Sequence, residues 1–134
     1  MKLLLVLIPI MLISIPFAYA DYLNLDNATL KGDISNLDAV IVLQFGDNHE
    51  QELYSKTIIT PTLDYGVIKI FDKLYTLDNS YVNIMGQSFT LKSFGNNYMI
   101  TIYAENLGDN NFEVRVYIFE DESRLKFTFD SILN

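Results

Sequence analysis

Short runs in which apolar and polar residues alternate follow one another from residue 28 onward, with Gly, Asn, Asp and Pro clustered between them. Alternation with a period of two indicates strands with one buried face, and turn signals every 8 to 12 residues or so are typical of sandwiches. The pattern predicts strands at 28–34, 39–45, 51–59, 66–71, 81–85, 88–94, 98–104, 112–119 and 124–130. We therefore expect an all-β fold, an immunoglobulin-like antiparallel β-sandwich of about seven to nine strands, by analogy of strand number and spacing.

The expected strands 88–94 and 98–104 pair in a register that the sequence itself specifies. Asn96 and Asn97 form a two-residue turn between them, because Asn tolerates the positive φ that such turns demand. The inward pairs are then Leu91 with Ile102 and Phe89 with Ala104, and the outward pairs are Phe94 with Met99 and Lys92 with Thr101. Both inward pairs are apolar, so this register is consistent with one buried face.

The hairpin of 112–119 and 124–130 is equally consistent. With "EDES" (120–123) as a four-residue loop, the inward pairs are all apolar: Ile118 with Leu125, Val116 with Phe127 and Val114 with Phe129. The outward face then carries the residues that we call the basic strip: Arg115, Tyr117, Phe119, Arg124 and Lys126. Cations beside aromatic rings are typical of contact hot spots. The competing interpretation is a solvated face, stabilised by cross-strand pairs at about 0.2 to 1 kcal/mol each.

The segment 47–56 has an ambiguous pattern. Asp47 with Glu50 resembles a capping box, and Glu52 with Lys56 has helical i,i+4 spacing, so a short helix is one interpretation. The β-rich "YSKTIIT" that follows favours a hairpin turn leading into a strand.

Residues 1–20 have the order of a secretory signal peptide: Lys2, then an apolar run broken by two prolines, then the small residues Ala18 and Ala20. We expect cleavage after Ala20 and a single domain over 21–134. An uncleaved membrane anchor is the alternative, because the apolar run approaches the ~20 residues of a spanning helix. Either way the domain is exported, so we expect it to be secreted or extracytoplasmic, at the cell surface.

The chain is acidic, with a formal net charge of −8. This balance argues against nucleic acid or an anionic membrane as the partner, because both require a concentrated positive field. No cysteine is present. Burial and strand pairing must therefore hold this exported domain together without disulfides.

The residues needed for catalysis do not form a recognisable set. His49 is the only histidine, and neither a nucleophile with its base nor a zinc or copper ligand set accompanies it. We expect no enzyme activity and no cofactor. Calcium is the remaining metal candidate, with Asp109, Asn111 and Glu113 as oxygen ligands, and ordinary Asx-type turns explain the same residues.

The predicted function is a non-catalytic recognition or adhesion module that binds a protein or envelope partner through a sheet face or edge. Phe94, Met99 and Tyr103 make the outward face of 88–104 unusually apolar and support this expectation. One alternative is a structural subunit of a surface layer or filament, in which 21–34 pairs with a neighbour's open sheet edge. The other is a carbohydrate-binding module that stacks sugars on exposed tyrosines.

We predict that the mature protein begins at Asp21, because Ala18 and Ala20 follow a proline-interrupted apolar run. Intact-mass measurement of the exported protein tests this. A mass that includes residues 1–20 would establish the anchor instead.

Overall fold

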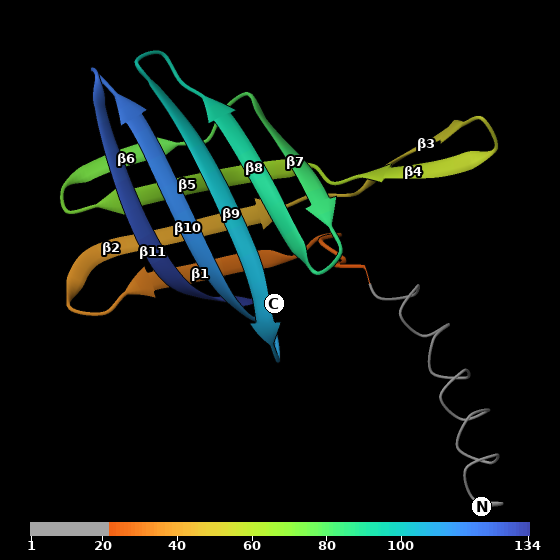
Figure 1. Ribbon diagram of the computed structural model, residues 1–134, viewed down its shortest axis with the longest axis horizontal. Helices are drawn as coiled ribbons and strands as arrows, with labels where there is room; N and C mark the ends of the chain where they lie inside the picture. Colours follow the sequence, from red (N-terminus) through yellow and green to blue (C-terminus); the bar gives the residue numbers. More distant parts are fainter. Residues whose placement is uncertain (1–21) are drawn as a thin grey trace, which may run out of the picture.

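The computed structural model describes residues 22–134, and its regular secondary structure is entirely β (Figure 1). The signal peptide and anchor predictions for 1–20 lie outside these residues. Within 22–134 there is no helix with the length and hydropathy that a membrane span requires. The strands are β1 (Thr29–Ile34), β2 (Leu37–Phe45), β3 (His49–Leu53), β4 (Lys56–Thr60), β5 (Leu63–Ile70), β6 (Lys73–Thr76), β7 (Ser80–Met85), β8 (Ser88–Phe94), β9 (Tyr98–Gly108), β10 (Asn111–Glu120) and β11 (Ser123–Leu133).

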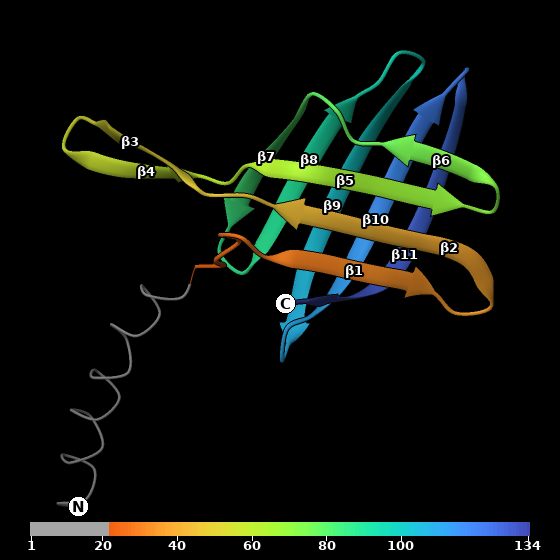
Figure 2. The same cartoon turned by 180° about the vertical axis from the view of Figure 1, so that it is seen from behind.

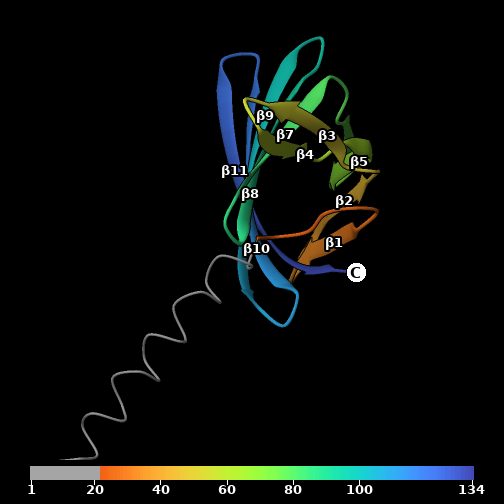
Figure 3. The same ribbon diagram turned by 90° about the vertical axis from the view of Figure 1, so that its right-hand side faces the viewer.

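Nine strands form one antiparallel sheet in the order β6-β5-β2-β1-β11-β10-β9-β8-β7. The sheet curls so that β6, β5, β2 and β1 cross behind β11 to β7, as the front and back views show (Figures 1 and 2). Seen from the side, the two halves are layers that face each other (Figure 3). The all-β prediction is confirmed. The immunoglobulin-like sandwich is not, because the two layers are parts of one hydrogen-bonded sheet instead of two sheets.

The pairing of β1 with β11 joins the two layers. Gly32 lies opposite Ser131 in this pair and opposite Ile41 on the β2 side. A Cβ atom at Gly32 would overlap the side-chain oxygen of Ser131 and lie 2.7 Å from the carbonyl oxygen of Asp130. Glycine is therefore required at this position by the close approach of β11.

Because β1 is paired on both sides, it offers no edge to a neighbouring molecule. The structural-subunit prediction assigned 21–34 to pairing with a neighbour's sheet, and for the strand at 29–34 this is wrong. The edges of the nine-stranded sheet are β6 and β7.

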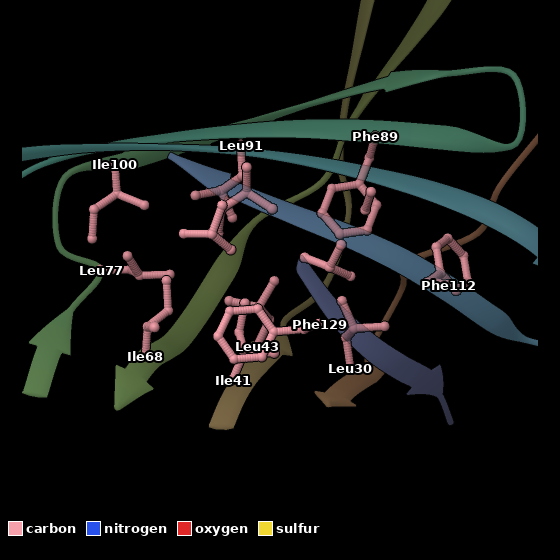
Figure 4. Close-up of a cluster of buried hydrophobic side chains, with 14 of the residues drawn as sticks. Leu30, Ile41, Leu43, Ile68, Leu77, Phe89, Leu91, Ile100, Phe112 and Phe129 are labelled. Atoms are coloured by element: carbon pink, nitrogen blue, oxygen red, sulfur yellow. The ribbon is translucent and has the colours of Figure 1, made fainter. Parts of the chain in front are cut away.

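The core lies between the layers and consists of the inward side chains of both (Figure 4). Phe89 of β8 joins them, with its ring centroid 5.4 Å from that of Phe45 on β2 at an interplanar angle of 85°. Phe112 of β10 lies 6.3 Å from Phe89 on the other side. All three rings are fully buried, and burial of such a side chain stabilises the fold by about 1.5–3 kcal/mol.

The edge strand β6 is tied to the opposite layer at one end of the domain. The phenol of Tyr75 donates a hydrogen bond to Glu120 Oε1 at 3.0 Å, and Lys73 forms an ion pair with the same carboxylate. The hydrogen bond from Lys73 lowers the pKa of Glu120 below its ordinary value, and burial raises the pKa of the Tyr75 phenol. Tyr98 donates to the carbonyl oxygen of Thr76 at 2.7 Å and contacts the Tyr75 ring edge to face.

The predicted registers of both hairpins are confirmed at every pair. Their turns differ from expectation. "EDES" contains a two-residue turn at Asp121 and Glu122, both with positive φ, and Glu120 and Ser123 extend the ladder. Asn96 and Asn97 make the expected connection without the positive φ that we attributed to them. The inward alternation, more than the turn type, thus determines the register.

One predicted strand is wrong, and one strand was not predicted. Residues 51–59 do not form one strand; they belong to the hairpin β3–β4, which turns at Tyr54 and Ser55 with φ of 51° and 64°. Neither residue is a usual signal for such a turn, since Asn and Gly are the common choices. The helix considered for 47–56 is absent. The short strand β6 was missed because four residues are too few to show alternation.

Gly32→Ala is expected to destabilise the protein by about 1 to 3 kcal/mol, because the added methyl group overlaps β11 at the junction of the layers. Lys31→Ala is the matched control: its side chain is exposed on the same strand, and a change within about 0.5 kcal/mol is expected. Denaturant melts of both variants provide the measurement. Equal stability of the two variants would show that β1 and β11 do not approach as closely as described.

Glu120→Gln is expected to weaken the attachment of β6 in a pH-dependent way. Since folding depresses the pKa of Glu120, its interaction stabilises the fold above the unfolded carboxyl pKa and is lost as pH falls through the folded value. The melting temperatures of variant and wild type should therefore differ most near neutral pH and converge in acid. Glu122→Gln is the control, because Glu122 forms no ion pair within residues 22–134. A gap that stays constant with pH would contradict the assignment.

Candidate functional site

All five residues of the basic strip lie together on the outer face of β10 and β11. The ladder places Arg115 opposite Thr128, Tyr117 opposite Lys126, and Phe119 opposite Arg124. Alternation directs Val114, Val116 and Ile118, the intervening residues of β10, into the core, where all three are fully buried. The sequence prediction of this face is therefore correct as to position.

Pairing of β9 with β10 joins the strip to the outer face of the neighbouring hairpin β8–β9. Side chains consequently form rows across β8, β9, β10 and β11. The first three rows are Phe94, Met99, Phe119 and Arg124; Lys92, Thr101, Tyr117 and Lys126; and Thr90, Tyr103, Arg115 and Thr128. These rows hold four cations and no carboxylate.

The next row reverses the charge. It consists of Ser88, Glu105, Glu113 and Asp130, so three carboxylates lie side by side. Arg115 bridges the boundary, with its Nε 3.8 Å from Glu113 Oε1. This Nε is buried without a hydrogen-bond partner, because the contact with Glu113 is too long for one.

The cations of the strip rest on aromatic rings. Arg124 Cζ lies 4.9 Å from the centroid of Phe119, and Lys126 Nζ lies 5.7 Å from that of Tyr117. Cation–π contacts of this kind contribute about 0.5–1 kcal/mol at exposed sites. Neither Arg124 nor Lys126 forms an ion pair in the part of the chain that the structure describes. Their charges are thus oriented by the rings and remain available to a partner.

A shallow open depression of about 560 Å³ lies in the middle of this face. Its lining comprises Lys92, Met99, Thr101, Tyr103, Arg115, Tyr117, Phe119 and Arg124. Thr101 is only 7% exposed although it belongs to the outer face, because larger neighbours surround it. The rings of Tyr103 and Tyr117 meet edge to face, 5.7 Å apart.

The sequence pattern places Lys92, Thr101 and Tyr103 on the outward side of 88–104. It did not lead us to predict that these residues lie beside the basic strip. The order of the strands could have indicated this contact, because consecutive antiparallel strands are usually neighbours in the sheet. Nothing in the sequence indicated the contact of Lys73 and Tyr75 with Glu120, which joins residues more than forty positions apart.

The calcium candidates occupy a tight turn. Asp109 and Asn110 have φ of 53° and 63° between β9 and β10, and Asn111 donates its amide hydrogens to the carbonyl oxygens of Gly108 and Asp109 at 3.2 and 3.3 Å. The Asx-type bond at this turn is made by Asn106, whose Oδ1 accepts from the Gly108 N–H at 2.9 Å, and Glu113 contacts Arg115. Over residues 22–134 no three His, Asp or Glu side chains are grouped so as to hold a metal ion.

His49 begins β3 and is exposed on the hairpin β3–β4, which projects beyond the curled sheet (Figure 1). It lies far along the chain from the strip and does not line the depression.

No family model matches the chain, and no significant match is found among curated proteins or solved structures. The function must therefore be argued from the geometry of the molecule.

His49→Ala is expected to leave both melting temperature and partner capture unchanged, because the side chain is exposed and removed from the depression. Surface substitutions of this kind change stability by about 0.5 kcal/mol or less. EDTA should likewise leave the wild-type melting temperature unchanged. A decrease in melting temperature that added calcium reverses would support a metal site at Asp109, Asn111 and Glu113.

Proposed function

We propose that the protein is an exported, non-catalytic recognition module that binds an acidic surface of a protein or envelope component through the outer face of β8 to β11. The signal-like order of residues 1–20 supports export. The layering is analogous to that of an immunoglobulin-like sandwich, with one curled sheet in place of two. In this proposal the basic strip forms the centre of the contact.

The observation that carries the proposal is the charge of the first three rows. Four cations without a carboxylate occupy three adjacent rows of one face, on a chain whose net charge is −8. Such a local reversal creates a positive potential where the rest of the surface repels acidic partners. Complementary potentials of this kind orient partners and accelerate their encounter.

The contacts of Arg124 with its ring suit it to recognise carboxylates. A guanidinium that lies over an aromatic face keeps its N–H edge free and can form two parallel hydrogen bonds with one carboxylate. The ring beneath holds the guanidinium in place, so less side-chain entropy is lost on binding.

The same contacts disfavour the stacking of a sugar on the basic strip. Stacking of a sugar requires a free aromatic face, whereas Phe119 and Tyr117 carry Arg124 and Lys126 over their rings. Tyr103 in turn carries Arg115, with Cζ 6.0 Å from its centroid.

Tyr117→Ala combined with Arg124→Ala is expected to preserve the fold and weaken capture of partners from the native envelope. Tyr65→Ala with Lys69→Ala is the matched control, since it removes one tyrosine and one cation from the exposed outer face of β5. Pull-down with mass spectrometry measures capture, and raised salt should weaken wild-type capture by screening.

Denaturant melts separate loss of binding from loss of folding. Truncation of the buried Val116 or of Phe127 to Ala should destabilise the protein by about 1 to 5 kcal/mol, whereas the strip variant should remain close to wild type. A strip variant that captures every partner as well as the control does would overturn the proposed function.

A further inference from the structure

The hairpin β3–β4 is not hydrogen-bonded to the nine-stranded sheet and contacts it only through β7 and the segment before β1. It forms a separate two-stranded sheet, and every residue from His49 to Thr60 is exposed. Several of these exposed side chains are apolar. Leu53, Ile58 and Ile59 are between 43% and 52% exposed, and Tyr54 is 91% exposed. An isolated two-stranded hairpin is marginal in water, and stability usually requires a third strand or a packed face.

The two edges of this hairpin differ in charge. Glu50 and Glu52 alternate along β3, and charged side chains are a common protection of an exposed strand edge. β4 carries a single charge, Lys56 beside the turn, and its other residues, Thr57 to Thr60, are TIIT, which is uncharged and has high β-propensity. The β4 edge is therefore the one open to pairing.

The turn determines which backbone groups face that edge. In a hairpin with a two-residue turn the flanking residues, Leu53 and Lys56, form a hydrogen-bonded pair, and bonded pairs alternate with non-bonded pairs along the ladder. Ile58 is consequently bonded to β3. The N–H and C=O groups of Thr57 and Ile59 point away from β3, and no strand pairs with them.

We propose that two copies of the protein dimerise by antiparallel pairing of β4 with β4 about a twofold axis at Ile58. Thr57 of each copy then exchanges hydrogen bonds with Ile59 of the other, so every free group on the edge is satisfied. The two hairpins become one four-stranded sheet. No charged pair is created in this segment, whereas pairing of β3 with β3 would place Glu50 against Glu52.

Side chains do not obstruct this edge. Thr57 and Ile59 alternate onto the face that is turned toward β7, where with Ile84 and Leu23 they help line a cavity of about 520 Å³. The contact is isologous, because the same strand of each copy provides it, and it therefore closes at two copies. The dimer would present two basic strips. Binding through both strips raises the avidity for a partner with repeated sites, without any new contact at either strip.

Single cysteines test the register, because the chain has none of its own. Ile58→Cys places two thiols at a non-bonded pair across the axis, where the Cα separation of about 4.5 Å suits a disulfide. Gln51→Cys, the neighbour of Ile58 on β3, is the control for random collision. We expect mild oxidation to cross-link Ile58→Cys about tenfold faster than Gln51→Cys, since pairing raises the effective concentration. Equal rates would overturn the proposal.

Charge on the edge tests the pairing in an otherwise natural chain. Thr57→Lys with Ile59→Lys, and separately Thr57→Glu with Ile59→Glu, should each sediment as a monomer, and an equal mixture should sediment as a dimer. Wild type should show a dimer that dissociates on dilution. A wild type that stays monomeric at every concentration, or charge variants that dimerise alone, would contradict pairing through β4.

Assembly into larger, open species would indicate head-to-tail pairing of β3 with β4 and would also overturn the twofold proposal. The dimer does not depend on the proposed function. The strip variant, Tyr117→Ala with Arg124→Ala, should dimerise normally. Loss of partner capture can therefore be distinguished from loss of dimerisation.

Discussion

The pairing of β1 with β11 is the contact on which the rest of the structure depends. It joins strands from opposite ends of the described domain, and it makes two facing layers into one continuous sheet. Gly32 permits this approach because β11 occupies the space that a side chain would need. The free edges β6 and β7 then lie at the other side of the sheet. The Lys73, Tyr75 and Glu120 contacts, with Tyr98 bonded to Thr76, attach β6 to the layer that it faces.

The curled sheet separates two environments on each strand. Inward residues of both layers share one aliphatic and aromatic core, where Phe89 contacts rings from β2 and β10. Outward residues of β8 to β11 are brought into rows by the same ladders. The separation of cations and carboxylates into different rows is a tertiary effect. Cations from three strands, and likewise carboxylates from three strands, are brought side by side only when the strands pair. An acidic protein thereby acquires one positively charged region on this face.

The hairpin β3–β4 extends outside this closed arrangement. It interrupts the connection between β2 and β5, which pair with each other, and so it leaves the main sheet intact. Its exposure and the uncharged Thr57–Thr60 stretch of its β4 edge are liabilities in a monomer. The proposed pairing with a second copy would resolve both, and two basic strips on one assembly would suit a partner with repeated acidic sites. The proposed recognition face and the proposed pairing edge thus lie in different parts of the chain.

Local alternation by itself determined most of the strands, and it determined the inward and outward faces and the register of the two C-terminal hairpins. Residues such as Val116 and Tyr117 alternate between core and solvent, and a shift of one position would bury the cations Arg115 and Lys126. Local sequence carries no comparable information on distant pairs. Whether β1 meets β11 depends on how closely two backbones approach, which only the packed layers decide. The turn at Tyr54 and Ser55 and the short strand β6 likewise have no strong local signal. One curled sheet therefore replaces the expected sandwich, because pairing between distant strands is selected by the fit of the whole core.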